Sequence, residues 1–331
     1  MKEFNFYKNL FKNFLVKKNS DLKQNKHLFK TNIQKSVNYI LNQKSKRIRP
    51  VLMLMFFDLY SDKYKECMPS ALSIELLHNF TLVHDDIMDN AKIRRSQKTI
   101  NEKWNNNVAI LTGDFLFNEA LSVLQDIKDP VKFKNIVAII NKSLFELCVG
   151  QDQDMLFEKL QEVSTNDYFT MIYNKTSSLI KSSILIGSYM GGADETEIKE
   201  IEKIGVSLGI IFQLKDDFLD IYGENKFGKK IYEDIINNKK TFFYVKAQEL
   251  GSNKDSEDLQ KLYSSNFSDS QKKINQVLSI YNKLNLKNIL NEKLEYEYQI
   301  IQQKILDLKS ENKITKDIIL NYVRFLIGRD V

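Results

Sequence analysis

The chain has 331 residues, of which 43% are hydrophobic and 28% charged, with 11 glycines and 3 prolines. Such a chain can bury a large core and contains few residues that interrupt helices, so a globular, soluble, helix-rich protein is predicted. The formal net charge of +6 is modest, and the basic residues are interspersed with acids. This argues against a dedicated nucleic-acid-binding protein and is compatible with a small anionic substrate.

The N-terminal segment, residues 1–30, is basic and carries apolar side chains at helical spacing. A transit peptide would be rich in arginine, yet the first arginine is Arg47, so we expect an ordinary first helix here. No apolar stretch reaches the roughly 18 to 20 residues of a membrane-spanning helix. Cys67 and Cys148 are the only cysteines, which indicates a cytoplasmic protein with reduced thiols rather than a disulfide framework.

An acidic motif follows the apolar helical stretch 74–83 and supplies three carboxylates, Asp85, Asp86 and Asp89. In a helix, Asp85 and Asp89 lie about one turn apart on the same side, with Asp86 beside them. Carboxylates this close in an apolar setting repel each other and are poorly solvated unless a cation neutralises them. Magnesium suits such a group because it takes a few carboxylate oxygens, keeps several waters and accepts the oxygens of a substrate phosphate.

Helical periodicity recurs through the middle of the chain, and no segment alternates convincingly like a strand. Residues 164–167 offer N-cap side chains before an apolar run, and Gly191 and Gly192 mark the end of one helix before Asp194 begins another. An all-α fold is therefore predicted. Two of the apolar stripes are Phe133, Ile136, Val137, Ile140, Leu144, Leu147 and Cys148, and Ile201, Ile204, Leu208, Ile211 and Phe212.

A second acidic motif of the same form follows about 130 residues after the first, with Asp216, Asp217 and Asp220 inside another apolar helical stretch. A single motif of this kind is usually a solvated acidic helix face, because short motifs have a high false-positive rate. Two copies, each flanked by apolar residues, are hard to explain as surface. The repetition therefore favours paired metal sites.

Basic residues suited to a diphosphate lie near both motifs. Arginine offers phosphate oxygens a planar fork, and lysine offers a mobile point charge. An isolated lysine would more often serve solubility, but proximity to the acids favours a binding role. The candidates are Lys46, Arg47, Arg49, Arg94, Arg95, Lys175, Lys229, Lys239 and Lys240.

The C-terminal third begins with a polar stretch, residues 252–270, which we expect to form a long loop or a poorly ordered crossing. Beyond it, residues 281–327 return to helical patterning rich in lysine and glutamate, which suits a peripheral layer.

Taken together, these motifs resemble those of the trans-isoprenyl diphosphate synthases, the polyprenyl synthetase family, of the short-chain type. The resemblance covers residues 40–245, with the motifs in the right order. It implies a single domain, residues 1–331, folded as one large helical bundle around a deep central cavity, and a homodimer. It rests on Lys46–Pro50, Glu75–His78, His84–Asp89, Arg94–Arg95, Lys175–Thr176, Phe212–Gln213, Asp216–Asp220, Phe227–Lys229, Asp234 and Lys239.

The resemblance also implies a role for each matching residue, with His84 left as a structural neighbour of the metal site. Three magnesium ions per active site would be held by Asp85, Asp86, Asp89, Asp216, Asp217 and Asp220. The diphosphate of an allylic substrate would be bound by Arg94, Lys175, Lys229 and Lys239. Isopentenyl diphosphate would be bound by Lys46, Arg49, His78 and Arg95, and Thr176 and Gln213 would face the developing allylic cation.

The reaction implied is ionisation of an allylic diphosphate (dimethylallyl, geranyl or farnesyl), condensation with isopentenyl diphosphate, and elimination of a proton. Phe80 and Thr81 lie one to two turns before Asp85, where the family sets product length with a floor of aromatic residues. One aromatic, Phe80, without a second at Thr81, resembles enzymes that make the C20 product geranylgeranyl diphosphate. The C15 product farnesyl diphosphate stays open, and so does a packing role for Phe80.

Two departures and two alternatives complete the interpretation. The chain has Lys44-Ser45 and Tyr232-Glu233 where family members usually carry glycine or other small residues, which affects how closely backbone can approach phosphate. A class I terpene cyclase also ionises a prenyl diphosphate, but normally with a different second metal motif. A non-catalytic subunit of a heteromeric synthase tends to lose the acidic or basic ligands that this chain retains.

Overall fold

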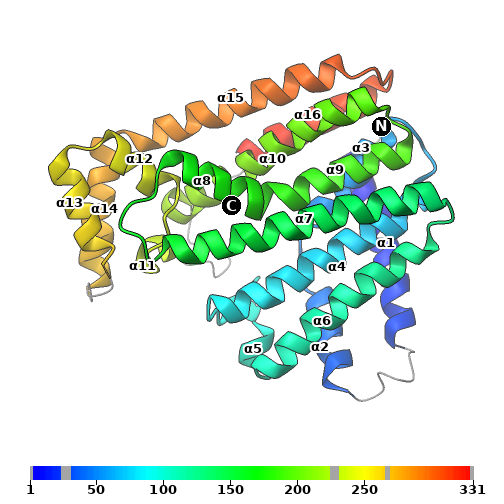
Figure 1. The fold of residues 1–331 in the computed structure, drawn as a ribbon, viewed down its shortest axis with the longest axis horizontal. Helices are drawn as coiled ribbons and strands as arrows, with labels where there is room; N and C mark the ends of the chain where they lie inside the picture. Colours follow the sequence, from blue (N-terminus) through cyan, green and yellow to red (C-terminus); the bar gives the residue numbers. More distant parts are fainter. Residues whose placement is uncertain (1–2, 24–30, 224–230, 265–268, 329–331) are drawn as a thin grey trace. The chain divides into compact units, whose positions relative to one another are not determined.

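The structure, a computed structural model, is almost wholly helical, as the scarcity of helix-breaking residues predicts (Figure 1). It describes residues 3–23, 31–223, 231–264 and 269–328. The helices are α1 (Phe4–Lys23), α2 (Asn32–Leu41), α3 (Ile48–Asp58), α4 (Tyr64–Met88), α5 (Ile100–Lys103), α6 (Asn106–Ser122), α7 (Pro130–Phe157), α8 (Thr165–Ile172), α9 (Ser178–Gly191), α10 (Glu195–Tyr222), α11 (Glu233–Ile236), α12 (Phe242–Leu250), α13 (Asn253–Leu262), α14 (Ser270–Lys283), α15 (Leu286–Asp307) and α16 (Lys313–Gly328). A 3₁₀ turn at Val123–Asp126 and a π-helical turn at Tyr173–Ser177 complete the helical segments.

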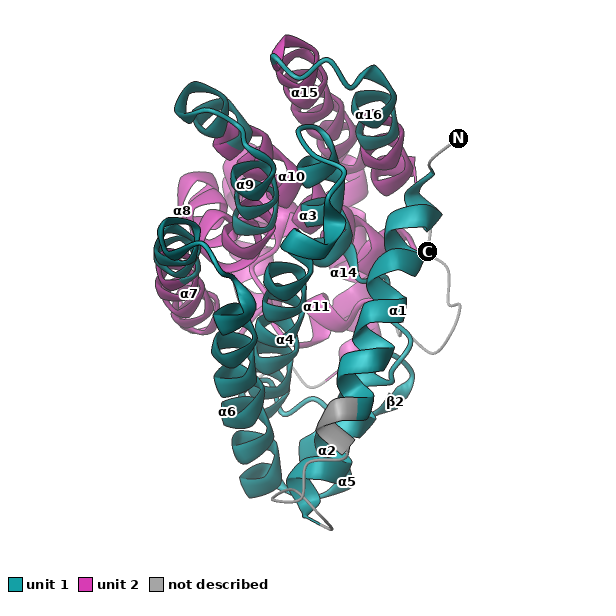
Figure 2. Cartoon of the chain, turned by 90° about the vertical axis from the view of Figure 1, so that its right-hand side faces the viewer, with its two compact units in different colours: residues 1–140, 182–201, 309–319 teal, residues 141–181, 202–308, 320–331 magenta. Residues whose placement is uncertain are grey.

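The chain divides into two compact units, coloured separately in Figure 2. The first unit comprises residues 1–140, 182–201 and 309–319, and the second comprises residues 141–181, 202–308 and 320–331. The division falls inside four of the helices, α7, α9, α10 and α16. The expected all-α fold is confirmed, whereas the single-domain assignment stays a prediction.

Helix α3 lies at the centre of the first unit because its sequence is apolar on every side. The side chains from Val51 to Phe57 are at most 1% exposed, as expected for a helix that is hydrophobic all round. Helix α4 packs against α3 and runs alongside α6, as both ribbon views show. This packing fixes α4, the helix that carries the first acidic motif.

A buried carboxylate connects four helices of the first unit. Asp58, at the end of α3, accepts hydrogen bonds from the hydroxyls of Tyr7 on α1 (2.8 Å) and Thr315 on α16 (2.5 Å), and from the Tyr64 hydroxyl at the start of α4. Asp58 is 3% exposed, and a carboxylate that deep needs such donors to offset its lost hydration. The acid therefore fixes both ends of the sequence to the apolar helix.

The second unit packs its aromatic residues around α12. This helix contacts α8, α13, α14 and α15, and the ring of Phe243 stacks on that of Tyr281 with centroids 5.7 Å apart. In the part of α10 that belongs to this unit, Gly205 and Gly209 lie directly against Lys181 and Ser177, so closely that a Cβ atom at either glycine would clash. The two glycines thus bring the helix of the second acidic motif against the π-helical turn and the start of α9.

The structure differs from the sequence predictions in two places. A two-stranded antiparallel hairpin, β1 (Ile93–Arg94) and β2 (Gln97–Lys98), follows the first acidic motif where no strand was expected. Residues 253–262 of the predicted loop at 252–270 form α13, because Ser252 and Asp255 make a capping box at its start and Leu259 and Leu262 are buried. Residues 265–268 of that stretch lie outside the described residues. The polar composition of this stretch reflects an amphipathic surface helix rather than a loop.

Candidate active site

The three acids of the first motif lie at the C-terminal end of α4. Asp85 and Asp86 belong to its last turn and Asp89 is its C-cap residue. Asp86 is 2% exposed, Asp85 is partly buried and Asp89 is exposed. The negative end of a helix dipole adds to the repulsion between neighbouring carboxylates and favours a bound cation. The first motif therefore presents an anionic end that suits Mg²⁺.

The middle acid of this motif, Asp86, forms an ion pair with an arginine of the unexpected hairpin. The Arg94 Nε donates to Asp86 Oδ1 at 2.7 Å. Burial raises the pKa of Asp86, although Arg94 opposes the shift. The turn between the strands places Arg95 and Ser96 at positive φ, 53° and 60°, as a tight two-residue hairpin requires. The hairpin thus fixes two predicted diphosphate ligands, Arg94 and Arg95, beside the acids.

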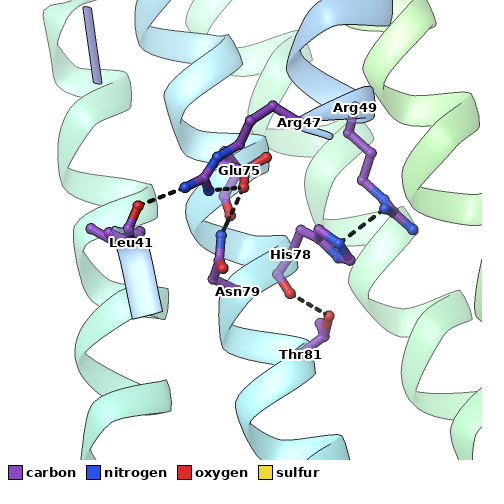
Figure 3. Close-up of polar contacts among 7 residues, drawn as sticks. All are labelled: Leu41, Arg47, Arg49, Glu75, His78, Asn79 and Thr81. Carbon is purple, nitrogen blue, oxygen red and sulfur yellow. Dashed lines mark hydrogen bonds and ion pairs between the residues drawn. The ribbon is translucent and has the colours of Figure 1, made fainter. Parts of the chain in front are cut away.

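A second group of cations surrounds the start of α3 (Figure 3). Arg47 is the N-cap residue of α3 with φ of 50°, and its guanidinium donates to the carboxylate of Glu75 and, at 2.6 Å, to the Leu41 carbonyl. Glu75 is 1% exposed and also accepts from Asn79 Nδ2 at 2.9 Å. The sequence placed Arg47 among the candidate diphosphate-binding cations, but in the structure its side chain binds Glu75 and the Leu41 carbonyl and holds this loop in place.

His78 lies one turn after Glu75 and faces Arg49 (Figure 3), with 3.1 Å between His78 Nε2 and Arg49 Nη1. Burial lowers the pKa of His78 well below its usual value, and Arg49, Arg95 and Arg94 lower it further. His78 is therefore neutral near pH 7, with Nε2 accepting from the arginine. Burial also lowers the pKa of Arg95 to about 10, which leaves it charged. This concentration of arginines suits an anionic group.

The two predicted chain-length residues have different partners. The ring of Phe80 lies edge-on to His84 (centroids 4.8 Å apart) and against Phe117 of α6 (5.4 Å). The hydroxyl of Thr81 donates to the His78 carbonyl at 2.9 Å and is buried with its helix (Figure 3). His84 in turn packs on Gly113, where any Cβ atom would clash with its ring. The structural role expected for His84 matches this contact between α4 and α6.

In the second unit, the middle acid of the second motif is held by three neutral donors. Asp217 Oδ2 accepts from the Tyr168 hydroxyl (2.6 Å) and from the Phe242 amide (2.8 Å), and Oδ1 accepts from Gln213 Nε2 (2.9 Å). The residue is 2% exposed, and burial raises its pKa to about 6. Gln213 extends this network, because its Oε1 accepts from the Thr176 hydroxyl at 2.7 Å.

The other two acids of the second motif differ in burial. Asp216 is partly buried, whereas Asp220 is 3% exposed and accepts from the Asp234 amide at 3.2 Å. The Asp220 carbonyl accepts from the amide of Tyr232, whose φ is 69°. Tyr232 is one of the residues found where the family usually has a small side chain, and it takes up the left-handed backbone without a glycine.

The predicted diphosphate ligands Lys175 and Lys239 converge on one acid that the sequence did not single out. Asp154 of α7 lies 2.6 Å from Lys175 Nζ and 3.2 Å from Lys239 Nζ. Burial alone would raise the pKa of Asp154, but the two lysines outweigh burial and lower it. Glu158 also pairs with Lys239, at 2.6 Å. The sequence around Asp154 gave no clear signal for this site, because positions on this part of α7 vary between buried and exposed.

One predicted ligand, Lys229, lies outside the described residues. Within the described ranges, no three acidic, histidine or cysteine side chains are grouped so that they alone could hold a metal ion. None of the helices in the described part of the chain is long and apolar enough to cross a membrane.

A family model described as polyprenyl synthetase matches residues 30–281. The chain belongs to the polyprenyl synthetase family. Membership makes it a prenyltransferase of the polyprenyl diphosphate synthase class. The family resemblance seen in the motifs and the all-α fold are both confirmed.

Similar proteins agree with the family assignment. The chain is 37% identical over 210 residues to a short chain isoprenyl diphosphate synthase of Methanocaldococcus jannaschii, a match that covers 63% of this chain and 64% of that protein. It is 38% identical over 222 residues to a geranylgeranyl pyrophosphate synthase of Geoglobus acetivorans, covering 66% of this chain and 69% of that protein. The matched segment thus spans about two thirds of each relative's length.

Solved structures extend the similarity along the whole chain. A crystal structure of a geranylgeranyl pyrophosphate synthase superposes with a TM-score of 0.91 at 31% identity and covers all of both chains. The geranylgeranyl pyrophosphate synthetase of Pyrococcus horikoshii Ot3 superposes with a TM-score of 0.88 at 29% identity, covering 98% of this chain and 99% of that one. The helices outside the matched family segment therefore also follow this fold.

Proposed function

We propose that this chain is a short-chain trans-prenyltransferase that condenses isopentenyl diphosphate with an allylic diphosphate, using Mg²⁺, and that its main product is geranylgeranyl diphosphate, with farnesyl diphosphate next. The observation that carries the proposal is the pairing of each acidic motif with its own cations. In the first motif, Asp86 accepts from Arg94 of the hairpin. In the second unit, Asp217 is linked through Gln213 to Thr176, and the adjacent Lys175 shares Asp154 with Lys239. Relatives with these product names support the substrate class.

The donor set fits Mg²⁺. Asp85 and Asp89 offer hard carboxylate oxygens at a helix C-terminus, and Asp216 offers another in the second motif. Magnesium is commonly bound by one or two carboxylates together with substrate phosphates, so groups smaller than three acids suffice. Asp86 and Asp217 already accept hydrogen bonds from protein donors. Both are also 2% exposed, whereas Asp85 and Asp216 are partly buried and Asp89 is exposed. From this difference in exposure we propose that Asp86 and Asp217 position their motifs and that Asp85, Asp89 and Asp216 are the principal ligands.

Ionisation of the allylic diphosphate breaks a C–O bond and leaves negative charge on the departing diphosphate. Lys175, Lys239 and Arg94 are proposed to stabilise that charge, each by a few kcal/mol in a dry site. Bound Mg²⁺ would supply further stabilisation of the leaving group as a Lewis acid. In the free protein, Asp154 holds both lysines. The lysines are thus positioned before the substrate arrives.

The carbocation that remains needs polar oxygens that do not attack it. The Thr176 hydroxyl donates to Gln213, and Gln213 donates to Asp217. Because the Thr176 hydroxyl proton is directed at Gln213, the lone pairs of Thr176 Oγ1 are proposed to face the cation. Isopentenyl diphosphate would be bound by Lys46, Arg49, His78 and Arg95, with neutral His78 orienting the Arg49 guanidinium.

A homodimer is the proposed assembly. Helix α6 exposes the apolar side chains Ile110 and Leu111, at 44% and 52%, and such exposure favours a protein partner. Light scattering of the purified chain measures its mass directly. A dimer that dissociates when Leu111 is replaced by glutamate would support α6 as the interface, and a monomeric wild type would contradict the proposed assembly.

The function is tested with the purified chain, labelled isopentenyl diphosphate and dimethylallyl, geranyl or farnesyl diphosphate, with and without Mg²⁺. Elongated linear diphosphates that form only with the metal are expected, and mass spectrometry identifies their length. Cyclised hydrocarbons would instead indicate a class I terpene cyclase. No turnover, followed by activity on adding a second synthase subunit, would indicate a non-catalytic partner subunit.

A further inference from the structure

One element of the second unit departs from regular helix where two proposed catalytic residues lie. The stretch from α8 through α9 runs as one helix, but residues Tyr173–Ser177 form a π-helical turn. A π-turn carries one residue more than an α-turn, is rarely stable by itself and often marks a functional site. Lys175 and Thr176 both belong to this turn.

Side chains from neighbouring helices brace the residues of the turn. Lys175 and Thr176 reach Asp154 on α7 and Gln213 on α10. The backbone at Lys175 lies against Gly150, where any Cβ atom would clash with the Lys175 amide nitrogen. Asn174 Nδ2 donates to Gln153 Oε1 at 3.0 Å. These contacts hold the middle of the turn, whereas its first residue, Tyr173, contacts a different residue.

That partner is a buried lysine, which the mechanism above does not use. Lys181 is 2% exposed, and its Nζ lies 2.8 Å from the Tyr173 hydroxyl and 3.0 and 3.2 Å from the two carboxylate oxygens of Glu146 on α7. The ammonium also lies 4.4 Å from the centre of the Tyr173 ring. Burial alone would lower the pKa of Lys181, but hydrogen bonds with Tyr173 and Glu146 outweigh burial and raise it.

The spacing between Tyr173 and Lys181 makes this contact sensitive to the register of the turn. In a regular α-helix, residues eight apart are rotated by about 80° around the helix axis, so their side chains diverge. One extra residue in the turn brings residues eight apart close to the phase of residues seven apart, which differ by only about 20°. The Tyr173–Lys181 hydrogen bond therefore suits the π-register and is strained or lost in the α-register.

We propose that Lys181, held by Glu146, is a positioning residue that fixes the π-register of Tyr173–Ser177 and thereby the directions of Lys175 and Thr176. This inference rests on the proposed function only for the roles of Lys175 and Thr176. If the turn relaxes to α-helix, the residues on either side of it rotate relative to each other by about 100°. Lys175 then leaves Asp154 or Thr176 leaves Gln213.

The test compares three variants. Lys181→Met removes the ammonium and keeps much of the side-chain volume. Lys181→Met with Glu146→Leu removes the whole ion pair, and replacing a buried pair by apolar residues is often neutral for stability. The matched control is Lys142→Met, which removes a lysine that is 62% exposed and lies 3.7 Å from Glu202, itself 3.9 Å from Lys181 Nζ. Circular dichroism and urea unfolding compare folding in all three.

Two readouts separate positioning from general stability. In both Lys181 variants, amide hydrogen exchange of Tyr173–Ser177 should become about tenfold faster or more, while α3 keeps its protection. The kcat for condensation should fall about 10- to 100-fold, because misplacing a catalytic group by about 1 Å costs that much. The KM for isopentenyl diphosphate should stay within about twofold, because its proposed ligands lie elsewhere. Lys142→Met should change neither readout.

The double variant decides the question. Wild-type stability with fast exchange in the turn and low kcat supports the positioning role. Native protection of the turn and full kcat in the stable double variant would overturn it, since the ion pair would then be dispensable for register. If wild-type protein shows no condensation, the proposed function fails, while hydrogen exchange of the turn still tests the inference by itself.

Discussion

The two acidic motifs share one pattern but have different surroundings. The first ends its helix, with Asp89 as the exposed C-cap of α4. The second lies before the end of α10, which runs on to Tyr222, and Asp220 is 3% exposed. In the first motif a charged arginine holds the middle acid, whereas in the second three neutral donors do so.

This difference shows that two motifs of the same form can differ in the burial of their carboxylates and in the donors that hold the middle acid. At the open end of α4, Asp85 and Asp89 face the negative end of the helix dipole and need a cation. Within α10, Asp217 and Asp220 are 2% and 3% exposed, whereas Asp216 is partly buried, so we propose Asp216 as the acid of this motif that contributes most to an external ligand. Corresponding acids of the two motifs are therefore expected to have different roles, and mutations can test which acid matters most for activity.

The largest effect is expected at the first motif, at the C-terminal end of α4. Asp85→Asn keeps the size of the side chain but removes its charge, so Mg²⁺ and the diphosphate lose a ligand that acts on the leaving group. We expect kcat/KM to fall by about 10³-fold or more, which corresponds to roughly 4 kcal/mol of transition-state stabilisation. Steady-state kinetics across a range of Mg²⁺ concentrations measure the loss.

Asp62→Asn serves as the control for that variant, because Asp62 is an exposed acid in the same unit. It should retain wild-type kinetics. Near-normal turnover of Asp85→Asn at low Mg²⁺ would contradict the metal-binding role of the first motif.

A smaller loss of activity, with a clear loss of stability, is expected at Asp217. Above its pKa of about 6 the carboxylate is charged and accepts from Tyr168, Gln213 and the Phe242 amide. Asparagine cannot accept all three, and a buried unsatisfied donor costs about 1 to 3 kcal/mol. We expect Asp217→Asn to lower the free energy of unfolding by about that amount and kcat by about 10- to 100-fold.

Urea unfolding and kinetics at pH 7.5 measure both effects, with the exposed Asp152→Asn as control. If Asp217→Asn lost as much activity as Asp85→Asn while remaining fully stable, the middle acid of the second motif and the first acid of the first motif would have equivalent roles. The proposed difference between the motifs would then be wrong.

The sequence was sufficient to predict the helical fold and to single out the two acidic motifs, because periodicity and repeated motifs are local signals. It was insufficient for partners that only folding brings together. Tyr168 is 49 residues from Asp217, and Asp154 is 21 residues from Lys175 and 85 from Lys239. No pattern in the sequence marks such pairs, since each acid alone resembles a surface residue.

The helix at Asn253–Leu262 was missed for a different reason. Its composition is largely polar, and its buried residues are Asp255, Leu259 and Leu262. Composition therefore indicated a loop, whereas the capping box formed by Ser252 and Asp255 was the better signal. The hairpin at Ile93–Lys98 was missed because strands of two residues are too short to show alternation.

A change in the product, rather than in the rate, is expected from substitution of Phe80 on α4, the helix that carries the first motif. Its ring fills space beside His84 and Phe117. Phe80→Ala should lengthen the main product by one or more isoprene units if the ring closes the cavity. Mass spectrometry of products from farnesyl diphosphate and isopentenyl diphosphate measures this. Phe117→Ala is the comparison, and an unchanged product distribution in Phe80→Ala would favour simple packing.

The smallest effect, a pH dependence, is expected from His78 among the arginines. Burial and the neighbouring arginines keep its folded-state pKa well below 6.5, so only the unfolded chain takes up this proton as the pH falls below 6.5. The stability contributed by neutral His78 is therefore present above pH 6.5 and is lost as the pH falls through and below that value.

His78→Asn removes this titration and leaves the other groups in place. Urea unfolding of wild type and variant between pH 8 and 5.5 should show the wild-type advantage shrinking only below about pH 6.5. Contributions from other titrating groups cancel in the difference between the two proteins. A difference that stays constant across this range would mean that His78 has the same pKa in the folded and the unfolded chain, and so contradict the lowered pKa expected from burial and the arginines.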